Sequence, residues 1–208
     1  MNKKYCLLIA VCLLFILIPS AYAQVNVGLK EGDWVEYTAT YTGNPPEAYP
    51  ETIRIEIQNI QDTTITLEID RDLLNGTKDV KTHSFDLEEG APDLIIIPAN
   101  LNVGDEVNHA GVGSFTIEGT ADYEFEGETR DLIYASVVGA EFKWDRTTGI
   151  LIQADQSTDT FTQTWLAVDS NIEQTQASDL DPVVLYGIIV VIVVIFVVVA
   201  LLVLRRKK

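Results

Sequence analysis

Apolar and polar residues alternate with a period of two along most of this sequence, and no other feature restricts its fold as strongly. Residues 53–58 read Ile-Arg-Ile-Glu-Ile-Gln, and residues 65–70 read Ile-Thr-Leu-Glu-Ile-Asp. Successive side chains of a β-strand point to opposite faces of a sheet, so each segment has one apolar face to bury. The pattern predicts antiparallel strands that cover a core on one side.

Turn signals separate these strands from one another. Residues 59–62 are expected to form a hairpin turn, and Asn75-Gly76 is the dipeptide that most readily supplies the two positive φ angles of a type I′ turn. Turns are also expected at residues 126–128 and 145–149. Further strands are predicted at residues 33–41, 79–87, 113–126, 130–138, 140–145, 149–154 and 160–168.

The number of strands defines the expected fold class. Only residues 89–104 depart from alternation, because the apolar run 94–97 leads into Pro98; we expect a buried strand or short helical turn there, followed by a crossover loop. The whole pattern predicts an all-β fold, either one antiparallel curved sheet (half-barrel-like) or a two-sheet sandwich. The short hairpins favour the curved sheet.

The first 23 residues have the composition of a secretory signal peptide. Two lysines precede an apolar run, and the small-residue tripeptide Ala-Tyr-Ala at positions 21–23 provides a cleavage site. Cleavage there would also remove both cysteines, Cys6 and Cys12. The exported domain is therefore expected to contain no disulfide.

Residues 183–204 contain no charged side chain and are predicted to form one transmembrane helix. A helix of this length spans ~33 Å, enough for a hydrocarbon core of ~30 Å. The basic residues 205–208 are expected to remain on the cytoplasmic side. The prediction is thus an extracytoplasmic β domain (24–169), a polar stalk (170–182), and an anchor that contacts membrane lipid through residues 183–204.

The predicted outer part, residues 24–182, is strongly acidic. It holds all 31 acidic residues and eight basic ones, a formal charge of −23 (8 − 31), compared with −17 for the whole chain. A field of this sign repels nucleic acid, which we exclude as a partner, and favours cationic partners or counter-ions.

Aromatic residues on the strands can either pack in the core or line a ligand groove. On the strand 33–41, Tyr37 is expected on the same face as Tyr41, whereas Trp34 points the other way. Core packing is the commoner role for such residues, including Trp144 and Trp165. A curved sheet could instead enclose an apolar cavity, and its expected walls are Tyr41, Phe115, Phe142 and Trp165.

No catalytic, cofactor-binding or metal-binding residues are predicted. The acidic clusters at 86–93 and 124–131 lack the spacing of a calcium loop, and His83 and His109 lack a third ligand. The sequence contains no nucleophile elbow, phosphate loop or HExxH motif. One N-glycosylation sequon, at Asn75, lies on an expected hairpin tip that a glycosylation enzyme could reach.

Three segments occur in order along the outer domain: GDWVEY at 32–37, IPANLNVGD at 97–105 and FKWDRTTGIL at 142–151. Together they resemble a group of uncharacterised archaeal membrane-anchored, β-rich cell-surface proteins. The resemblance covers most of the outer domain and implies a cell-surface location, without implying an activity. The expected curved sheet is also similar to that of half-barrel lipoprotein carriers, by analogy of fold alone.

Two main hypotheses for function follow. The first is a membrane-tethered cell-surface interaction or envelope-structural module, without catalytic chemistry, that contacts an extracellular protein or glycan. The alternative is an extracytoplasmic binding protein that holds a lipid or other small apolar ligand in a curved β-sheet. A third hypothesis is an exported hydrolase that uses a pair of carboxylates.

Overall fold

The structure is a computed structural model that describes residues 25–173, which form one compact unit. The expected signal peptide, the transmembrane helix, the basic tail and most of the stalk lie outside the described residues. Within the described part of the chain, no helix is long and apolar enough to cross a membrane.

Eleven strands account for most of residues 25–173, and no helix occurs among them. The strands are β1 (Trp34–Gly43), β2 (Pro50–Gln61), β3 (Thr64–Leu73), β4 (Lys78–Asp86), β5 (Glu106–His109), β6 (Gly113–Thr116), β7 (Gly119–Phe125), β8 (Glu128–Val137), β9 (Ala140–Asp145), β10 (Leu151–Ser157) and β11 (Phe161–Ser170).

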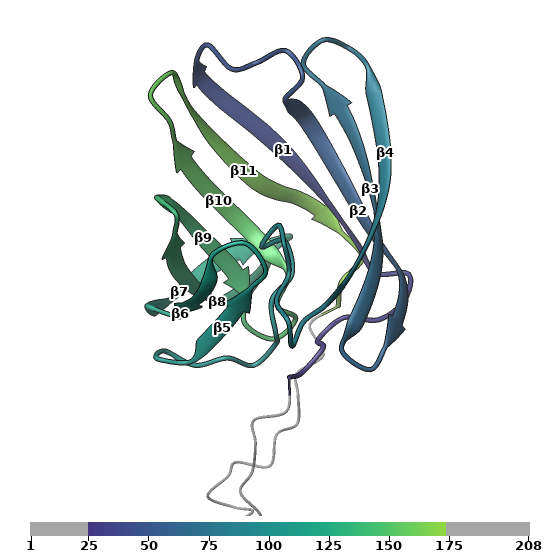
Figure 1. The fold of residues 1–208 in the computed structure, drawn as a ribbon, viewed down its shortest axis with the longest axis vertical. Helices are drawn as coiled ribbons and strands as arrows, with labels where there is room; N and C mark the ends of the chain where they lie inside the picture. Colours follow the sequence, from purple (N-terminus) through teal and green to yellow (C-terminus); the bar gives the residue numbers. More distant parts are fainter. Residues whose placement is uncertain (1–24, 174–208) are drawn as a thin grey trace, which may run out of the picture. The chain divides into compact units, whose positions relative to one another are not determined.

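Nine of these strands form one antiparallel sheet in the order β4-β3-β2-β1-β11-β10-β9-β8-β7. Two runs of hairpins, β1 to β4 and β7 to β11, meet where the first and last strands pair side by side (Figure 1). β5 and β6 form a separate two-stranded sheet. The prediction of an all-β, antiparallel fold is confirmed.

The apolar positions of neighbouring strands are in register, which gives the sheet one apolar face. Val35 of β1 pairs with Ile55 of β2, and Ile55 pairs with Ile69 of β3. All three side chains are buried. A slip of one residue between any two strands would turn one strand's apolar side chains toward solvent, so the alternation itself specifies the register.

The irregular segment between β4 and β5 covers one half of this apolar face. Residues 94–97 are all buried, and Ile96 forms an isolated antiparallel bridge with Ile150. The Leu151 amide donates to the Ile95 carbonyl at 2.8 Å, which ties the segment to β10. The expected strand or helical turn is absent from residues 89–104, which form isolated bridges, bends and turns instead.

The expected strand at 113–126 is in fact two strands, β6 and β7, that belong to different sheets. Ile117 lies between them and is buried. Its amide donates to the Asp105 carbonyl at 3.0 Å, and its carbonyl accepts from Gly104 at 2.9 Å. These long-range bonds redirect the chain, and β5, which supplies the partner strand for β6, was not anticipated from the sequence.

Two hairpin turns differ from their expected form. The first lies after Gln61 rather than at 59–62, because the ladder continues to the pair formed by Gln61 and Thr64. At the second, Gly76 has a positive φ of 79° and Asn75 does not, so the turn is not type I′. Its hairpin, β3 to β4, forms as predicted.

The folded unit extends past residue 169, where the expected stalk was placed. Asn171 donates to the Gly32 carbonyl at 3.0 Å and accepts from the Trp34 amide at 2.7 Å. Ile172 is buried, and its carbonyl accepts from the buried guanidinium of Arg130 at 3.3 Å. The two described ends of the chain are therefore fastened to each other at one end of the domain.

Candidate functional site

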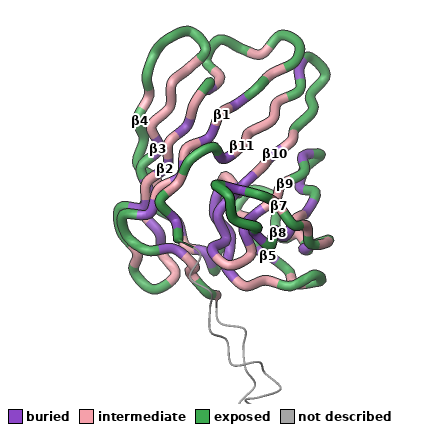
Figure 2. The backbone as a smooth tube through the Cα atoms, turned by 180° about the vertical axis from the view of Figure 1, so that it is seen from behind, coloured by how far each residue is buried: buried purple, intermediate pink, exposed green. Residues whose placement is uncertain are grey.

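One half of the apolar face of the sheet is left uncovered. Residues 87–118 cross the half of the face that lies near the described chain ends (Figure 1). No described segment crosses the other half, which contains the β1–β2 and β10–β11 turns. Figure 2 shows the consequence, since buried positions concentrate in the covered half and intermediate or exposed positions in the open half. A candidate site is therefore sought at the boundary between them.

Two pockets lie at this boundary and share two lining residues, Asp93 and Trp165. The β3–β4 pocket has a volume of about 200 Å³ and the β9–β10 pocket about 170 Å³. The first is lined by Ile53, Ile69, Arg71, Lys81, His83, Asp93, Ile95 and Trp165. The second is lined by Asp93, Ala140, Phe142, Leu151, Ala154, Gln156, Gln163 and Trp165.

The register of three neighbouring strands explains why the β9–β10 pocket exists. Ala154 of β10 pairs with Trp165 of β11 on one side and with Phe142 of β9 on the other. A methyl group between two large aromatic side chains leaves space that neither ring fills. The sequence thus builds a recess with an alanine floor and aromatic walls.

Asp93 brings a carboxyl group into these apolar surroundings. Burial raises its pKa above the ordinary value of 3.8, while a hydrogen bond from the Ile95 amide and the proximity of His83 oppose the rise. The Ile95 amide lies 3.3 Å from the carboxyl oxygen Oδ1. Within residues 25–173, Asp93 forms no ion pair. It is therefore a desolvated acid that no described residue neutralises through an ion pair.

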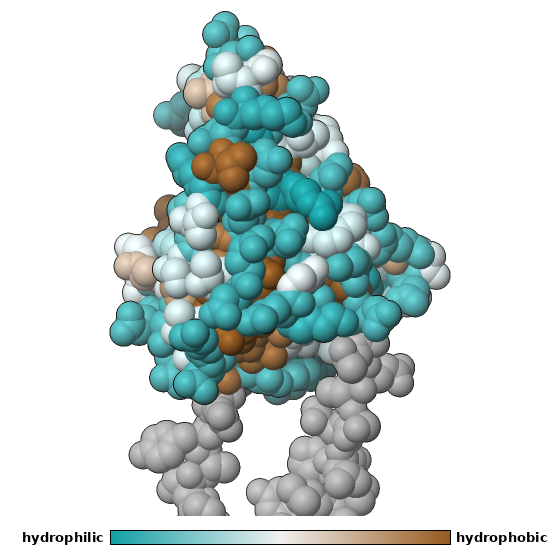
Figure 3. Space-filling view, turned by 90° about the vertical axis from the view of Figure 1, so that its right-hand side faces the viewer, coloured by the Kyte–Doolittle hydropathy of each residue, from teal (hydrophilic) through white to brown (hydrophobic). Residues whose placement is uncertain are grey.

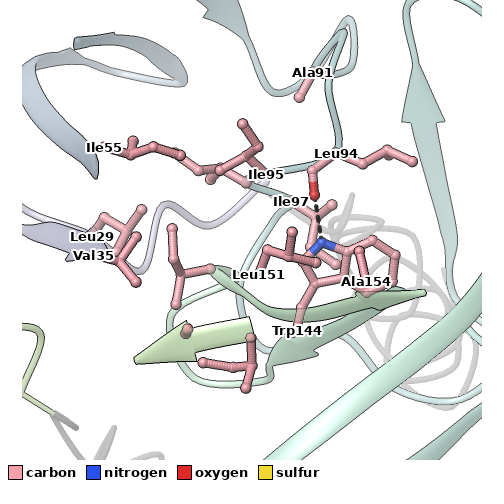
Figure 4. Close-up of a cluster of buried hydrophobic side chains, with 14 of the residues drawn as sticks. Leu29, Val35, Ile55, Ala91, Leu94, Ile95, Ile97, Trp144, Leu151 and Ala154 are labelled. Carbon is pink, nitrogen blue, oxygen red and sulfur yellow. Dashed lines mark hydrogen bonds between the residues drawn. The ribbon is translucent and has the colours of Figure 1, made fainter. Parts of the chain in front are cut away.

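The backbone that carries Asp93 is held in place by Trp144. The buried indole Nε1 of Trp144 donates to the Leu94 carbonyl at 2.7 Å (Figure 4). Leu94 has a φ of 60°, a left-handed conformation that is unusual for a leucine. The rings of Phe115 and Phe142 stack on Trp144 with centroid distances of 5.8 and 5.6 Å. This contact network fixes a strained turn beside the pocket.

Three polar atoms of residues that line the pockets are buried without a hydrogen-bonding partner among the described residues. They are the indole Nε1 of Trp165, the amide oxygen Oε1 of Gln163 and Nε of Arg71. Leaving a buried donor or acceptor unsatisfied costs about 1–3 kcal/mol.

The cations of the β3–β4 pocket are already paired. Arg71 and Lys81 both bind Asp79, Lys81 at 3.4 Å. These contacts and Arg71 in particular lower the pKa of Asp79. The two cations therefore carry a counter-ion of their own, in contrast to Asp93.

The structure brings two of the four expected cavity residues to one place. Phe142 and Trp165 line the β9–β10 pocket. Phe115 lies on β6 and stacks on Trp144 instead. Tyr41 packs against Tyr49 and Phe161 away from both pockets, and burial raises its pKa to about 12.

Sequence reasoning missed Asp93 as a pocket residue, because the acidic cluster at 86–93 was considered only as a calcium loop. The available signal was its position next to the apolar run 94–97, which must fold back onto the sheet. Among the described residues, no group of three or more histidine, cysteine, aspartate or glutamate side chains could hold a metal ion.

No protein-family model and no curated protein matches this chain.

The sequon at Asn75 lies on an exposed turn. Its side-chain oxygen Oδ1 accepts hydrogen bonds from the Thr77 amide at 2.9 Å and the Thr77 hydroxyl at 2.7 Å. The turn is distant in sequence from the strands that form the β9–β10 pocket. Glycosylation at this residue stays a prediction.

Proposed function

We propose that this chain is a membrane-tethered extracytoplasmic binding protein that holds a small ligand with an apolar body against the open half of its curved sheet. The observation that carries the proposal is the pair of pockets that share Asp93 and Trp165. Concave, largely apolar recesses with a few converging polar groups are the usual form of small-molecule sites. The combined space is at the lower end of such sites, which favours a small molecule over a two-chain lipid.

Two residues that line the β9–β10 pocket carry unsatisfied polar atoms, which supports a polar contact with a ligand there. Trp165 and Gln163 both line the β9–β10 pocket, and the donor Nε1 of Trp165 and the acceptor Oε1 of Gln163 are buried without a partner among the described residues. Phe142 and Leu151 supply apolar contact on the same walls. The half-barrel form expected from the sequence suits this role, because a curved sheet encloses a ligand on three sides.

The outer surface gives less support to an interaction module. Figure 3 views the flank of the domain that carries β4, and this flank is mainly hydrophilic with separate apolar patches. Large exposed apolar side chains are scattered over different turns and strands: Leu74, Val80, Val103, Val112, Val138 and Val168. Single exposed apolar residues are normal on a soluble surface and do not define a docking patch.

Ligand retention tests the proposal. The full chain, expressed in its own host and released from the membrane in nanodiscs, should show a small-molecule mass in native mass spectrometry. Gln156→Trp places a large ring at the mouth of the β9–β10 pocket and should abolish that mass. Ser157→Trp is the matched control, because Ser157 is exposed and belongs to the opposite face of β10. A mass equal to the bare chain for the unsubstituted protein would overturn the proposal.

A further inference from the structure

The β9–β10 pocket has a single charged lining residue, Asp93. The other lining side chains are apolar, aromatic or amide-bearing, and none is a lysine, arginine or histidine. A carboxylate in such surroundings is stable as an anion only if a cation approaches it. No lysine or arginine among the described residues pairs with Asp93, since Arg71 and Lys81 in the adjoining pocket bind Asp79. His83 and His109 attract the Asp93 charge without forming an ion pair with it.

The aromatic walls of this pocket suit a positively charged group as well. Phe142 and Trp165 line the recess on the two sides of Ala154. The face of an aromatic ring attracts ammonium groups, most strongly for tryptophan. Gln163 adds a buried amide oxygen that has no partner among the described residues and can accept a hydrogen bond from an N–H donor.

We propose that the β9–β10 pocket binds a small organic cation, an ammonium group carried on a short apolar body, with Asp93 as its counter-ion. This inference rests on the proposed function and names the ligand class of the same site. The ammonium group pairs with the Asp93 carboxylate and donates to Gln163 Oε1. The apolar body packs against Phe142, Leu151 and Trp165.

The surrounding charge favours the same class of ligand. The predicted outer part of the chain carries a formal charge of −23 (8 − 31), so its field attracts cations and repels anions. An anionic ligand would meet Asp93 in both pockets and would have to compete with Asp79 for Arg71 and Lys81. A cation meets no such competition in the β9–β10 pocket.

Burial of Asp93 also argues for a functional role. Burial raises the pKa of its carboxyl group, which disfavours the charged form in the free protein. An ammonium ion bound beside it would favour the charged form again and so would lower this pKa. The other titratable groups near it or in its pockets are Tyr37, His83, His109, Arg71, Lys81 and Asp79.

A matched set of three probes tests the inference on the full chain in phosphatidylcholine nanodiscs, with empty discs as the blank. Phenethylammonium, 2-phenylethanol and 3-phenylpropanoate share an aromatic body and differ in the charge of the head group. Isothermal titration calorimetry at neutral pH should show binding of phenethylammonium at least tenfold tighter than binding of either other probe.

Two variants locate the interaction. Asp93→Asn keeps the shape of the side chain and should weaken phenethylammonium binding at least tenfold. Asp159→Asn removes the same charge from an exposed turn and should leave binding unchanged. Equal losses in both variants would show attraction by the net charge alone and would overturn the assignment of the site.

The outcomes separate this inference from the proposed function. If all three probes bind equally and Gln156→Trp blocks them, the pocket is a binding site and the preference for cations is wrong. If phenethylammonium does not bind the unsubstituted chain, the inference is wrong whatever native mass spectrometry shows. Preference among the probes is measured on the unsubstituted protein, so it does not depend on how the variants fold.

Discussion

Trp144→Phe should destabilise the fold far more than a tryptophan-to-phenylalanine change on the outer face of the sheet. Trp144 is fully buried, and its Nε1 donates to the Leu94 carbonyl at 2.7 Å. Phenylalanine cannot donate, so the buried Leu94 carbonyl loses its partner at a cost of about 1–3 kcal/mol. The smaller ring also leaves a void between Phe115 and Phe142. Together these effects should lower the free energy of unfolding by about 3 kcal/mol.

Urea unfolding of a chain truncated to residues 25–173, followed by circular dichroism, measures this change. Trp34→Phe is the control, because Trp34 lies on the opposite face and stacks under Arg54 at 3.8 Å, a contact that a phenyl ring retains in part. The control should change the free energy of unfolding by less than about 1 kcal/mol.

Hydrogen exchange adds a local readout to the same prediction. The amides of Ile97 and Leu151 hold residues 94–97 against the sheet through bonds to Gly149 and Ile95. If Trp144 clamps this segment, these amides should exchange faster in Trp144→Phe than in Trp34→Phe. Equal unfolding midpoints and equal exchange for the two variants would refute the reasoning.

Three further predictions follow from other parts of the domain. Arg130→Met removes a cationic partner at 3.3 Å from buried Asp145, which keeps its hydrogen bonds from Thr147 and Thr148, and should lower the free energy of unfolding by about 3 kcal/mol, a loss that calorimetry can check. Val138 has a φ of 50° and is 77% exposed, so Val138→Asn should raise the free energy of unfolding by about 1 kcal/mol in urea melts; a loss of stability would contradict this. Burial raises the pKa of Asp93, so its contribution to stability is complete below pH 3.8 and is lost as pH rises through the folded-state pKa. Asp93→Asn should therefore flatten the decline in stability above pH 3.8, and an unchanged pH profile would count against a buried carboxyl group.

The strands were predictable because their information is local. In β2, isoleucines at every second position define a buried face without reference to the rest of the chain. The strand order β9-β10-β11 places Phe142 and Trp165, two of the four residues expected to line a cavity, on either side of β10. The prediction worked where strand order followed chain order.

Prediction failed where distant segments determine the structure. Residues 94–97 have no apolar period, and their conformation depends on bonds to residues 149–151 that are more than 50 positions away in the chain. Asp93 becomes a pocket residue only because this segment folds back over the sheet. Phe115 lines neither of the two pockets, because its strand β6 pairs with β5 rather than with the main sheet.

The indole resonance of Trp165 offers the most direct measurement of the central claim that the pocket beside Asp93 binds a ligand. The chain contains three tryptophans, and each gives one Nε1–H signal when the residue is labelled with nitrogen-15. Trp165 lines both pockets with its Nε1 unpaired, Trp144 is bonded to Leu94, and Trp34 lies on the outer face. Titration of the full chain with phenethylammonium should shift the Trp165 signal to saturation and leave that of Trp34 in place. A Trp165 signal that does not move, or equal shifts of all three signals, would contradict the account.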